Sequence, residues 1–335
     1  MKVAVIGAGA IGGYVGTRLA LAGEDVTFMV RGANLAAIRD NGFRLIGHDG
    51  NEEHATAVKA SSDYAETGPQ ELVILALKAH HVEAVARDVP KLLGPDTAVV
   101  TMQNGIPYWY FHRHGGALDG SPVRSVDPNG LIAEMIPPQR VIGCVVYPAA
   151  ELVAPGVVRH IEGERFPLGE LDGSSSERVN RIAAVFERAG FKAPVLANIR
   201  AEIWLKLWGN LTFNPISSLA HSTLVEICQY PPTRELAAAM MREAQAVAHK
   251  LGIEFRVSLE KRIAGAEKVG EHKTSMLQDV EAGRAPEIDA LVGSVVELAR
   301  LTETPTPRID TVYSLVKLLA RTMEARRGQV RLCTP

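Results

Sequence analysis

The N-terminal half of the chain alternates short apolar runs with amphipathic stretches, the pattern of alternating strands and helices. The β-branched run Lys2 to Ile6 predicts a strand, Tyr14 to Ala22 a helix, and Asp25 to Val30 a second strand. The continuous apolar run Glu71 to Leu77 is typical of a buried parallel strand, and Thr97 to Met102 predicts another. This alternation predicts an α/β, Rossmann-type N-terminal domain.

Further elements follow in the same half. Glycines and prolines around the later strands indicate antiparallel turns, so we expect a mixed sheet. Helices are expected over 35–41, 82–93 and 177–189, and strands over 141–147, 156–161, 165–168 and, briefly, 195–197.

Beyond residue 198 the pattern becomes helical throughout. Long stretches with a helical apolar period predict an all-α second domain, and no convincing strand is present. We therefore expect two domains, 1–197 and 198–335. The expected helices cover 201–211, 232–251, 258–270, 286–302 and 307–327, followed by a frayed tail over 326–335.

Residues 106–140 form an irregular stretch rich in proline, glycine, histidine and aromatic residues, including Tyr108 to His112. The stretch is long for a connection within a compact domain. Two interpretations stay open: a functional loop whose aromatics favour a larger substrate, or a surface insertion.

The first strand leads directly into a glycine motif, G-x-G-x-x-G, and then into a helix. Gly7 suits a tight turn, Gly9 lets the backbone approach a pyrophosphate, and Gly12 lets the helix lie close to the strand. The helix N-terminus then offers free N–H groups to phosphates. The predicted cofactor loop is Gly7, Ala8, Gly9, Ala10, Ile11 and Gly12.

Three more residues are expected on the cofactor side. Arg31 follows the second strand, where an NAD site usually has an acid, and it suits the 2′-phosphate of NADP; the alternative is a solvated charge. Lys78 and Asn104 follow the strands ending near Leu77 and Met102, at the ligand-binding edge of a parallel sheet. Ordinary loop polarity is the alternative for both.

The composition excludes several functions. The formal net charge is −2, from 36 basic and 38 acidic residues, and no basic run is present, which argues against nucleic acid. Cys144, Cys228 and Cys333 are too widely spaced for a disulfide framework or a metal site. No apolar run reaches the roughly 18 residues of a membrane span. We expect a cytoplasmic protein that binds no membrane and holds no metal.

The segment from Asn198 to Pro215 carries the main candidate chemistry. Lys206, Asn210 and Asn214 recur every fourth residue, so on a helix they share one face, with about 40° of drift per step. Apolar neighbours nearly all round predict a buried helix, in which a lysine is costly unless it is used. Such a lysine can act as a proton donor. The alternative is a snorkelling lysine with two capping asparagines.

A second polar cluster contains Ser275 and, twelve residues later, Glu287. By itself it is ordinary, because Ser275 suits a helix cap and an acid after Pro286 suits a first helical turn.

Taken in order, these segments resemble the ketopantoate reductase family (2-dehydropantoate 2-reductase). The resemblance covers about 300 residues, and the stretch near 106–140 is its main departure. The matching segments are GAGAIGG at 7–13, VR at 30–31, LALKAH at 75–80, QNG at 103–105, NIRAEIWLKLWGN at 198–210, NP at 214–215 and TSMLQDVEAGRAPEID at 274–289.

The resemblance implies an NADPH-dependent reduction of a small anionic 2-keto acid to a 2-hydroxy acid, with ketopantoate to pantoate as the first choice. It places the catalytic lysine on Lys206 and the catalytic glutamate on Glu287. It assigns substrate binding to Asn210, Asn214 and Ser275, and cofactor binding to the glycine loop, Arg31, Lys78 and Asn104. A homodimer is left open.

One asparagine of the family is absent, since His221, Ser222, Thr223 and Leu224 stand near its place. This departure keeps other 2-keto acids open as substrates. An opine or 3-hydroxyacid dehydrogenase is a second enzymatic alternative, and an NADP-sensing regulatory protein is a non-enzymatic one.

Overall fold

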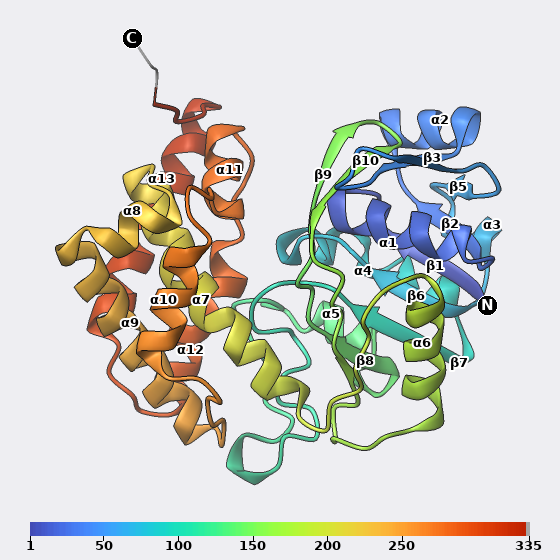
Figure 1. The fold of residues 1–335 in the computed structure, drawn as a ribbon. Coiled ribbons are helices and arrows are strands. Elements are labelled where there is room, and N and C mark those ends of the chain that lie inside the picture. The colour runs from blue at the N-terminus through green and yellow to red at the C-terminus, as the bar shows by residue number, and fades with distance from the viewer. Residues whose placement is uncertain (333–335) are drawn as a thin grey trace. The chain divides into compact units, whose positions relative to one another are not determined.

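The computed structural model describes residues 1–332, which form two compact units. The first unit is α/β and the second is helical, so the predicted fold class is confirmed (Figure 1). The first unit comprises Met1–Asn104, Tyr108–Pro122 and Asp127–Ile199. The second comprises 200–332 together with two short segments from the middle of the chain, Gly105–Pro107 and Val123–Val126.

A seven-stranded sheet forms the centre of the first unit. Its order is β11-β8-β7-β6-β1-β2-β5, and all neighbours are parallel except β8 and β11, so the sheet is mixed as predicted. The chain order reverses between β1 and β6, the place where ligands of such sheets bind. The strands are β1 (Lys2–Ile6), β2 (Asp25–Met29), β5 (Lys59–Ser61), β6 (Gln70–Leu75), β7 (Leu93–Thr101), β8 (Val141–Cys144) and β11 (Leu168–Gly169).

A second sheet of four strands packs against α1 (Ala10–Leu21) in the same unit (Figure 1). Its order is β4-β3-β10-β9, and Tyr14 of α1 stacks on His160 of β10 with ring centroids 4.4 Å apart. Only β10 lies where a strand was predicted. The four strands are β3 (Phe43–Ile46), β4 (Glu52–Ala55), β9 (Ala149–Ala154) and β10 (Val157–Glu162).

The prediction of a single helix over 82–93 is wrong. The chain there forms a short α4 (Glu83–Ala86) between two 3₁₀ turns, and β7 already begins at Leu93. Pro90 explains the break, because its ring clashes with the carbonyl four residues earlier, that of Ala86, where α4 ends. The predicted strand over 195–197 is reduced to one bridge between Val195 and Leu168. The unit's other helices are α2 (Gly32–Asn41), α3 (Tyr64–Thr67), α5 (Leu131–Met135) and α6 (Glu177–Arg188).

The aromatic residues of the 106–140 stretch are core residues. Tyr108, Trp109, Tyr110 and Phe111 are all buried, Trp109 Nε1 donates to Thr101 Oγ1 at 3.0 Å, and Tyr108 Oη donates to a backbone carbonyl at 2.8 Å. The surface-insertion interpretation is therefore wrong. The interpretation as a functional loop whose aromatics favour a larger substrate stays a prediction.

The second unit contains seven α-helices among the described residues. α7 runs through Pro215 and is much longer than the predicted 201–211, and α8 and α11 were not predicted. The tail is described only to residue 332. No helix of the described chain is long and apolar enough to cross a membrane. The helices are α7 (Ile199–Ala220), α8 (Leu224–Gln229), α9 (Pro231–Lys250), α10 (Leu259–Lys268), α11 (Ser275–Glu281), α12 (Ser294–Leu301) and α13 (Pro307–Arg326).

Candidate active site

The glycine loop between β1 and α1 has the geometry that its motif requires. Gly7 has a φ of +97°, and a Cβ at Gly12 would lie 1.9 Å from the carbonyl oxygen of Gly7. At Gly9, the N-cap of α1, a Cβ would meet no atom within 4 Å, and the first turn of α1 carries no acid. The loop thus leaves an open, uncharged approach to free backbone N–H groups, which fits a pyrophosphate.

Arg31 lies at the N-cap of α2, directly beyond β2, and its side chain is exposed. Burial raises the pKa of the nearby Tyr64 hydroxyl to about 12; Asp88 raises it too, and Arg31 lowers it. Tyr64 is therefore neutral at physiological pH and adds no negative charge near Arg31. A cation in this setting fits a 2′-phosphate.

Lys78 and Asn104 follow two adjacent parallel strands at their carboxyl ends, β6 and β7. Gln103, the residue before Asn104, holds this edge together, because its Nε2 donates to the carbonyls of Leu75 at 2.7 Å and Leu77 at 3.0 Å. The role of Gln103 could have been suspected from its place in the QNG segment, but its partners could not.

Asn34 is a second residue that the sequence reasoning missed. Its Nδ2 donates to the carbonyl of Ala8 at 3.3 Å, and its Oδ1 accepts from the N–H of Gly156 at 3.1 Å. Asn34 therefore fixes the glycine loop to the turn between β9 and β10. No local pattern marks it, because both partners are distant in the sequence.

Lys206, Asn210 and Asn214 lie on one continuous helix, α7. Lys206 and Asn210 are half-buried, and Asn214 is buried. Because both asparagines lie inside a 22-residue helix, the capping alternative for them is wrong. The opposite face of α7 is core, where Trp204 and Trp208 are fully buried and Trp208 Nε1 donates to the Met241 carbonyl at 2.8 Å. This packing fixes the orientation of the α7 face that carries Lys206, Asn210 and Asn214.

A buried carboxylate precedes Lys206 by one helical turn. Glu202 has a side chain that is 1% exposed, and it forms an ion pair with Arg256 at 2.9 Å. Unpaired buried charges are costly, so this pair explains how a buried glutamate is tolerated on this helix. The sequence analysis did not single out either residue.

Ser275 is the first residue of α11, but it is not the cap. Thr274 fills that role, since its Oγ1 accepts from the N–H of Leu277 at 3.2 Å, and the side chain of Ser275 is exposed. The capping alternative for Ser275 is therefore wrong. One turn further along α11, Asp279 Oδ1 lies 3.0 Å from Arg284 Nε and holds the following loop.

Glu287 stands at the centre of a tight turn, in which the N–H of Ile288 donates to the carbonyl of Pro286 at 3.0 Å. It precedes the helical residues, so its assignment to a first helical turn is wrong. The next residues, Asp289–Gly293, form a π-helical turn before α12, a feature common at functional sites.

The π-helical turn is anchored from two sides within the second unit. Asp289 accepts from Tyr313 Oη at 2.8 Å and pairs with Lys317 Nζ at 2.9 and 3.0 Å. Burial, followed by the hydrogen bond to Asp289, raises the pKa of the Tyr313 hydroxyl, which keeps it a donor. The carbonyl of Ala290 accepts from the N–H of Ile106, two residues beyond Asn104.

The two groups of predicted residues thus fall in different units. All the cofactor candidates belong to the first unit, and Lys206, Asn210, Asn214, Ser275 and Glu287 all belong to the second. Among the described residues no cluster suits a metal ion.

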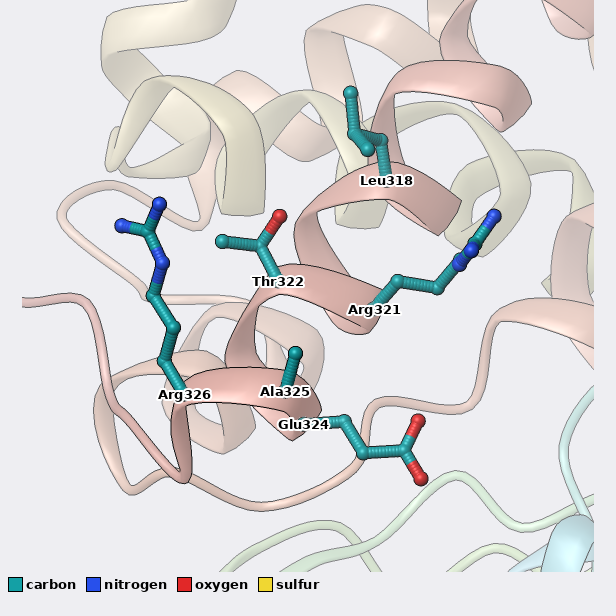
Figure 2. Close-up of a pocket in the computed structure, with 6 residues that line it drawn as sticks. All are labelled: Leu318, Arg321, Thr322, Glu324, Ala325 and Arg326. Atoms are coloured by element: carbon teal, nitrogen blue, oxygen red, sulfur yellow. The ribbon is translucent and has the colours of Figure 1, made fainter.

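A hollow of about 530 Å³ lies elsewhere in the second unit, along α13 (Figure 2). None of the predicted site residues lines this hollow. Its lining residues are Leu318, Arg321, Thr322, Glu324, Ala325 and Arg326.

Comparison with known families accounts for both units. Residues 3–173 match the family model described as "Ketopantoate reductase PanE/ApbA", and residues 198–320 match "Ketopantoate reductase PanE/ApbA C terminal". The chain belongs to the ketopantoate reductase family. The glycine loop and Arg31 lie within the first matched range, and Lys206 and Glu287 lie within the second.

Individual relatives span the whole chain. It is 55% identical over 321 residues to a 2-dehydropantoate 2-reductase of Mesorhizobium japonicum, covering 96% of this chain and 98% of the relative. A crystal structure of a proposed ketopantoate reductase from Ralstonia solanacearum MolK2 has a TM-score of 0.92 at 43% identity, covering 98% and 99%. The 2-dehydropantoate 2-reductase of Methylococcus capsulatus gives 0.82 at 28% identity, covering 96% and 98%.

Proposed function

We propose that this chain catalyses the NADPH-dependent reduction of 2-dehydropantoate (ketopantoate) to pantoate. The observation that carries the proposal is the near full-length similarity to a 2-dehydropantoate 2-reductase, 55% identical over 96% of the chain. Supporting it, Lys206 and Glu287, to which the resemblance assigns the catalytic roles, lie within one compact unit.

The glycine loop, Arg31, Lys78 and Asn104 would hold the cofactor. The backbone N–H groups at the start of α1 suit the pyrophosphate, and Arg31 suits the 2′-phosphate through two parallel hydrogen bonds. When bound, NADPH supplies the hydride that reduces the substrate's C2 carbonyl. Lys78 and Asn104 follow the carboxyl ends of β6 and β7, the edge of the sheet at which such cofactors bind.

Lys206 would act as the general acid. Negative charge develops on the carbonyl oxygen as C2 is reduced, and a protonated Nζ stabilises that charge and then donates its proton to form the hydroxyl. The product gains one hydride at C2 and one proton at the oxygen. The fixed orientation of α7 supports this role, because a general acid must be held within hydrogen-bond reach of its acceptor.

Glu287 and the remaining polar residues would orient the substrate. The Glu287 carboxylate accepts a hydrogen bond from the substrate's hydroxyl, and it favours the charged form of a neighbouring amine. The Ser275 hydroxyl and the amides of Asn210 and Asn214 bind the carboxylate. The exposed side chain of Ser275 is available for this, because Thr274 caps α11 in its place.

A different 2-keto acid is the second candidate substrate, and one observation favours it. The family's asparagine is absent, and the residues near its place are His221, Ser222, Thr223 and Leu224; the N–H of Leu224 donates to the carbonyl of His272, three residues before Ser275. An apolar side chain at this place would suit a substrate with less polar substituents. Family membership in both units argues against the opine-type and sensor alternatives.

Consumption of NADPH against a panel of 2-keto acids tests the proposal. Ketopantoate should exceed 2-ketoisovalerate, which lacks the hydroxyl, by up to ~10⁴-fold in kcat/KM, because a site built to bond a hydroxyl rejects its analogue. A better rate with 2-ketoisovalerate would favour the second candidate. Absence of turnover with every keto acid would refute both and favour a sensor.

We also propose that a second copy of the chain packs on α13. Leu315 and Leu318 are 51% and 60% exposed on this helix, beside Arg321 and Glu324 at the hollow of Figure 2. A two-fold arrangement can place these opposite charges against each other. Sedimentation velocity should show a dimer that Leu318→Asp converts to a monomer; a monomeric unaltered protein would refute this.

The cytoplasm is the location we propose for the reaction. Cys144 and Cys228 are buried thiols outside any disulfide, as expected in a reducing compartment, and Cys333 lies outside the described residues. Cell fractionation with an activity assay tests this, and activity confined to a membrane or extracellular fraction would contradict it.

A further inference from the structure

The polar helix α7 contains an interior glycine, Gly209, beside the residues assigned to catalysis. A glycine inside a helix is unfavourable relative to alanine, so its presence calls for a local reason. The reason lies on α10. A Cβ at Gly209 would stand 2.1 Å from Arg262 Nη2 and 2.9 Å from Arg262 Cζ. The guanidinium group of Arg262 therefore occupies the space that any other side chain at position 209 would take.

This contact places a second cation beside Lys206. Gly209 lies three residues beyond Lys206, which corresponds to about 4.5 Å along the helix axis and about 60° around it. Side chains at this spacing are neighbours on a helix surface. Gly209 also directly precedes Asn210. Arg262, itself half-buried, thus approaches from α10 the flank of the face that carries Lys206 and Asn210.

The charges on this side of α7 favour an anion. Glu202 lies one turn before Lys206 and has Arg256 as an ion-pair partner at 2.9 Å. Counting formal charges, and including Glu287 of the proposed site, the three cations Lys206, Arg256 and Arg262 outnumber the two acids Glu202 and Glu287. Arginine is also the residue best suited to a carboxylate, because its planar group is always charged and donates two parallel hydrogen bonds.

We propose that Arg262, admitted by Gly209, is a substrate-binding residue that holds the carboxylate of the 2-keto acid. The proposal rests on the proposed function and deepens it, because it names the group that selects anionic substrates. Ser275 contributes a neutral hydrogen bond to the same carboxylate, whereas Arg262 contributes charge. Gly209 is the matching specificity residue, since any larger residue displaces the guanidinium.

Kinetic measurements with ketopantoate, which carries a carboxylate, and with the uncharged ketopantolactone test the role of Arg262. Arg262→Ala and Arg262→Gln should raise KM for ketopantoate on the order of 10–100-fold, the loss expected for a charged hydrogen bond. KM for ketopantolactone, which has no carboxylate, should change little. Added guanidinium ions should partly restore the Ala variant. Lys261→Ala, which removes an exposed charge from the same helix, should leave KM unchanged and serves as the control.

A double-mutant cycle tests the pairing with Gly209. Gly209→Ala alone should raise KM for ketopantoate as Arg262→Ala does, because the new Cβ displaces the guanidinium. In the Arg262→Ala background the same change should add nothing to KM and should raise the melting temperature. Gly265→Ala on α10, where a Cβ meets nothing within 4 Å, is the matched control and should raise the melting temperature without altering KM.

The outcomes separate this inference from the proposed function. If the unaltered protein reduces no 2-keto acid, the proposed function fails and the inference fails with it. If the unaltered protein reduces ketopantoate while Arg262→Gln keeps its KM, only the inference is overturned. Equal losses for ketopantoate and the lactone, or additive effects of the two substitutions on KM, would also overturn it, because they indicate a structural role.

Discussion

The second and third glycines of the cofactor loop, Gly9 and Gly12, should have separable roles, Gly12 in folding and Gly9 in binding. At Gly12 a new Cβ would lie 1.9 Å from the Gly7 carbonyl oxygen and 3.0 Å from the Ala76 Cβ. Since Cβ atoms essentially never come closer than 3.0 Å to another atom, α1 would have to move away from the loop at Gly7 by about 1 Å, the difference between 3.0 and 1.9 Å. Overpacking of a buried helix on this scale costs about 3 kcal/mol.

Gly9→Ala should behave in the opposite way. A Cβ there meets nothing within 4 Å, and the φ and ψ of −76° and −163° suit alanine. Alanine caps a helix less well than glycine, by ~0.5 kcal/mol, but it restricts the unfolded chain by a similar amount, so stability should be nearly unchanged. The methyl group would instead occupy the approach of the pyrophosphate. NADPH binding should weaken on the order of 10–100-fold, as for a lost charged hydrogen bond.

Thermal unfolding and NADPH fluorescence titration, applied to both variants, measure the two effects. Gly12→Ala should lower the melting temperature by ~6–12 °C, from about 2–4 °C per kcal/mol for a chain of this size. Gly9→Ala should have the same melting temperature as the unaltered protein but a lower affinity for NADPH. Tight NADPH binding by Gly9→Ala would refute the assigned approach of the cofactor, and an unaltered melting temperature for Gly12→Ala would refute the close packing of α1.

Three further predictions concern single residues. Arg31→Ala should weaken NADPH binding on the order of 10–100-fold and leave NADH binding unchanged, because one charged contact to the 2′-phosphate is lost; equal losses in a titration with both cofactors would remove Arg31 from that site. Glu287→Ala should raise KM for ketopantoate while NADPH affinity in the same titration is retained, and a parallel fall in NADPH affinity would contradict its assignment to the substrate. Trp109→Phe should lower stability by about 1 kcal/mol through loss of the bond to Thr101, with the preference among aliphatic and aromatic 2-keto acids unchanged; a shift in that preference would mean that the buried aromatics do select the substrate.

The elements that the sequence predicts well are those whose pattern is local. The strand, glycine turn and helix at the N-terminus depend on neighbouring residues, and the structure places them where expected. β4 was not predicted, because most of its residues, such as Glu52 and Glu53, are exposed and charged and become a strand only by pairing with β3. Similarly, the π-helical turn depends on Asp289, whose partners Tyr313 and Lys317 are more than twenty residues away.

In the candidate site, too, features set by neighbouring residues could be predicted and features set by distant partners could not. Lys206, Asn210 and Asn214 could be grouped from their spacing, because a helix makes that spacing a face. Their surroundings could not be predicted, since Arg262 reaches α7 from another helix and Glu202 depends on Arg256. Capping by Ser275 failed because the neighbouring Thr274 takes that role, and capping by the two asparagines failed because α7 continues past them.

A comparison of ketopantoate reduction by the unaltered protein and by Lys206→Ala tests most directly the central claim that Lys206 is the proton donor. NADPH oxidation under saturating conditions gives kcat for both proteins, and thermal unfolding confirms that the variant is folded. The loss of a general acid predicts a fall in kcat of about 10²–10⁴-fold with the melting temperature retained. Near-normal turnover by a folded Lys206→Ala protein would contradict the assignment of Lys206 as the proton donor.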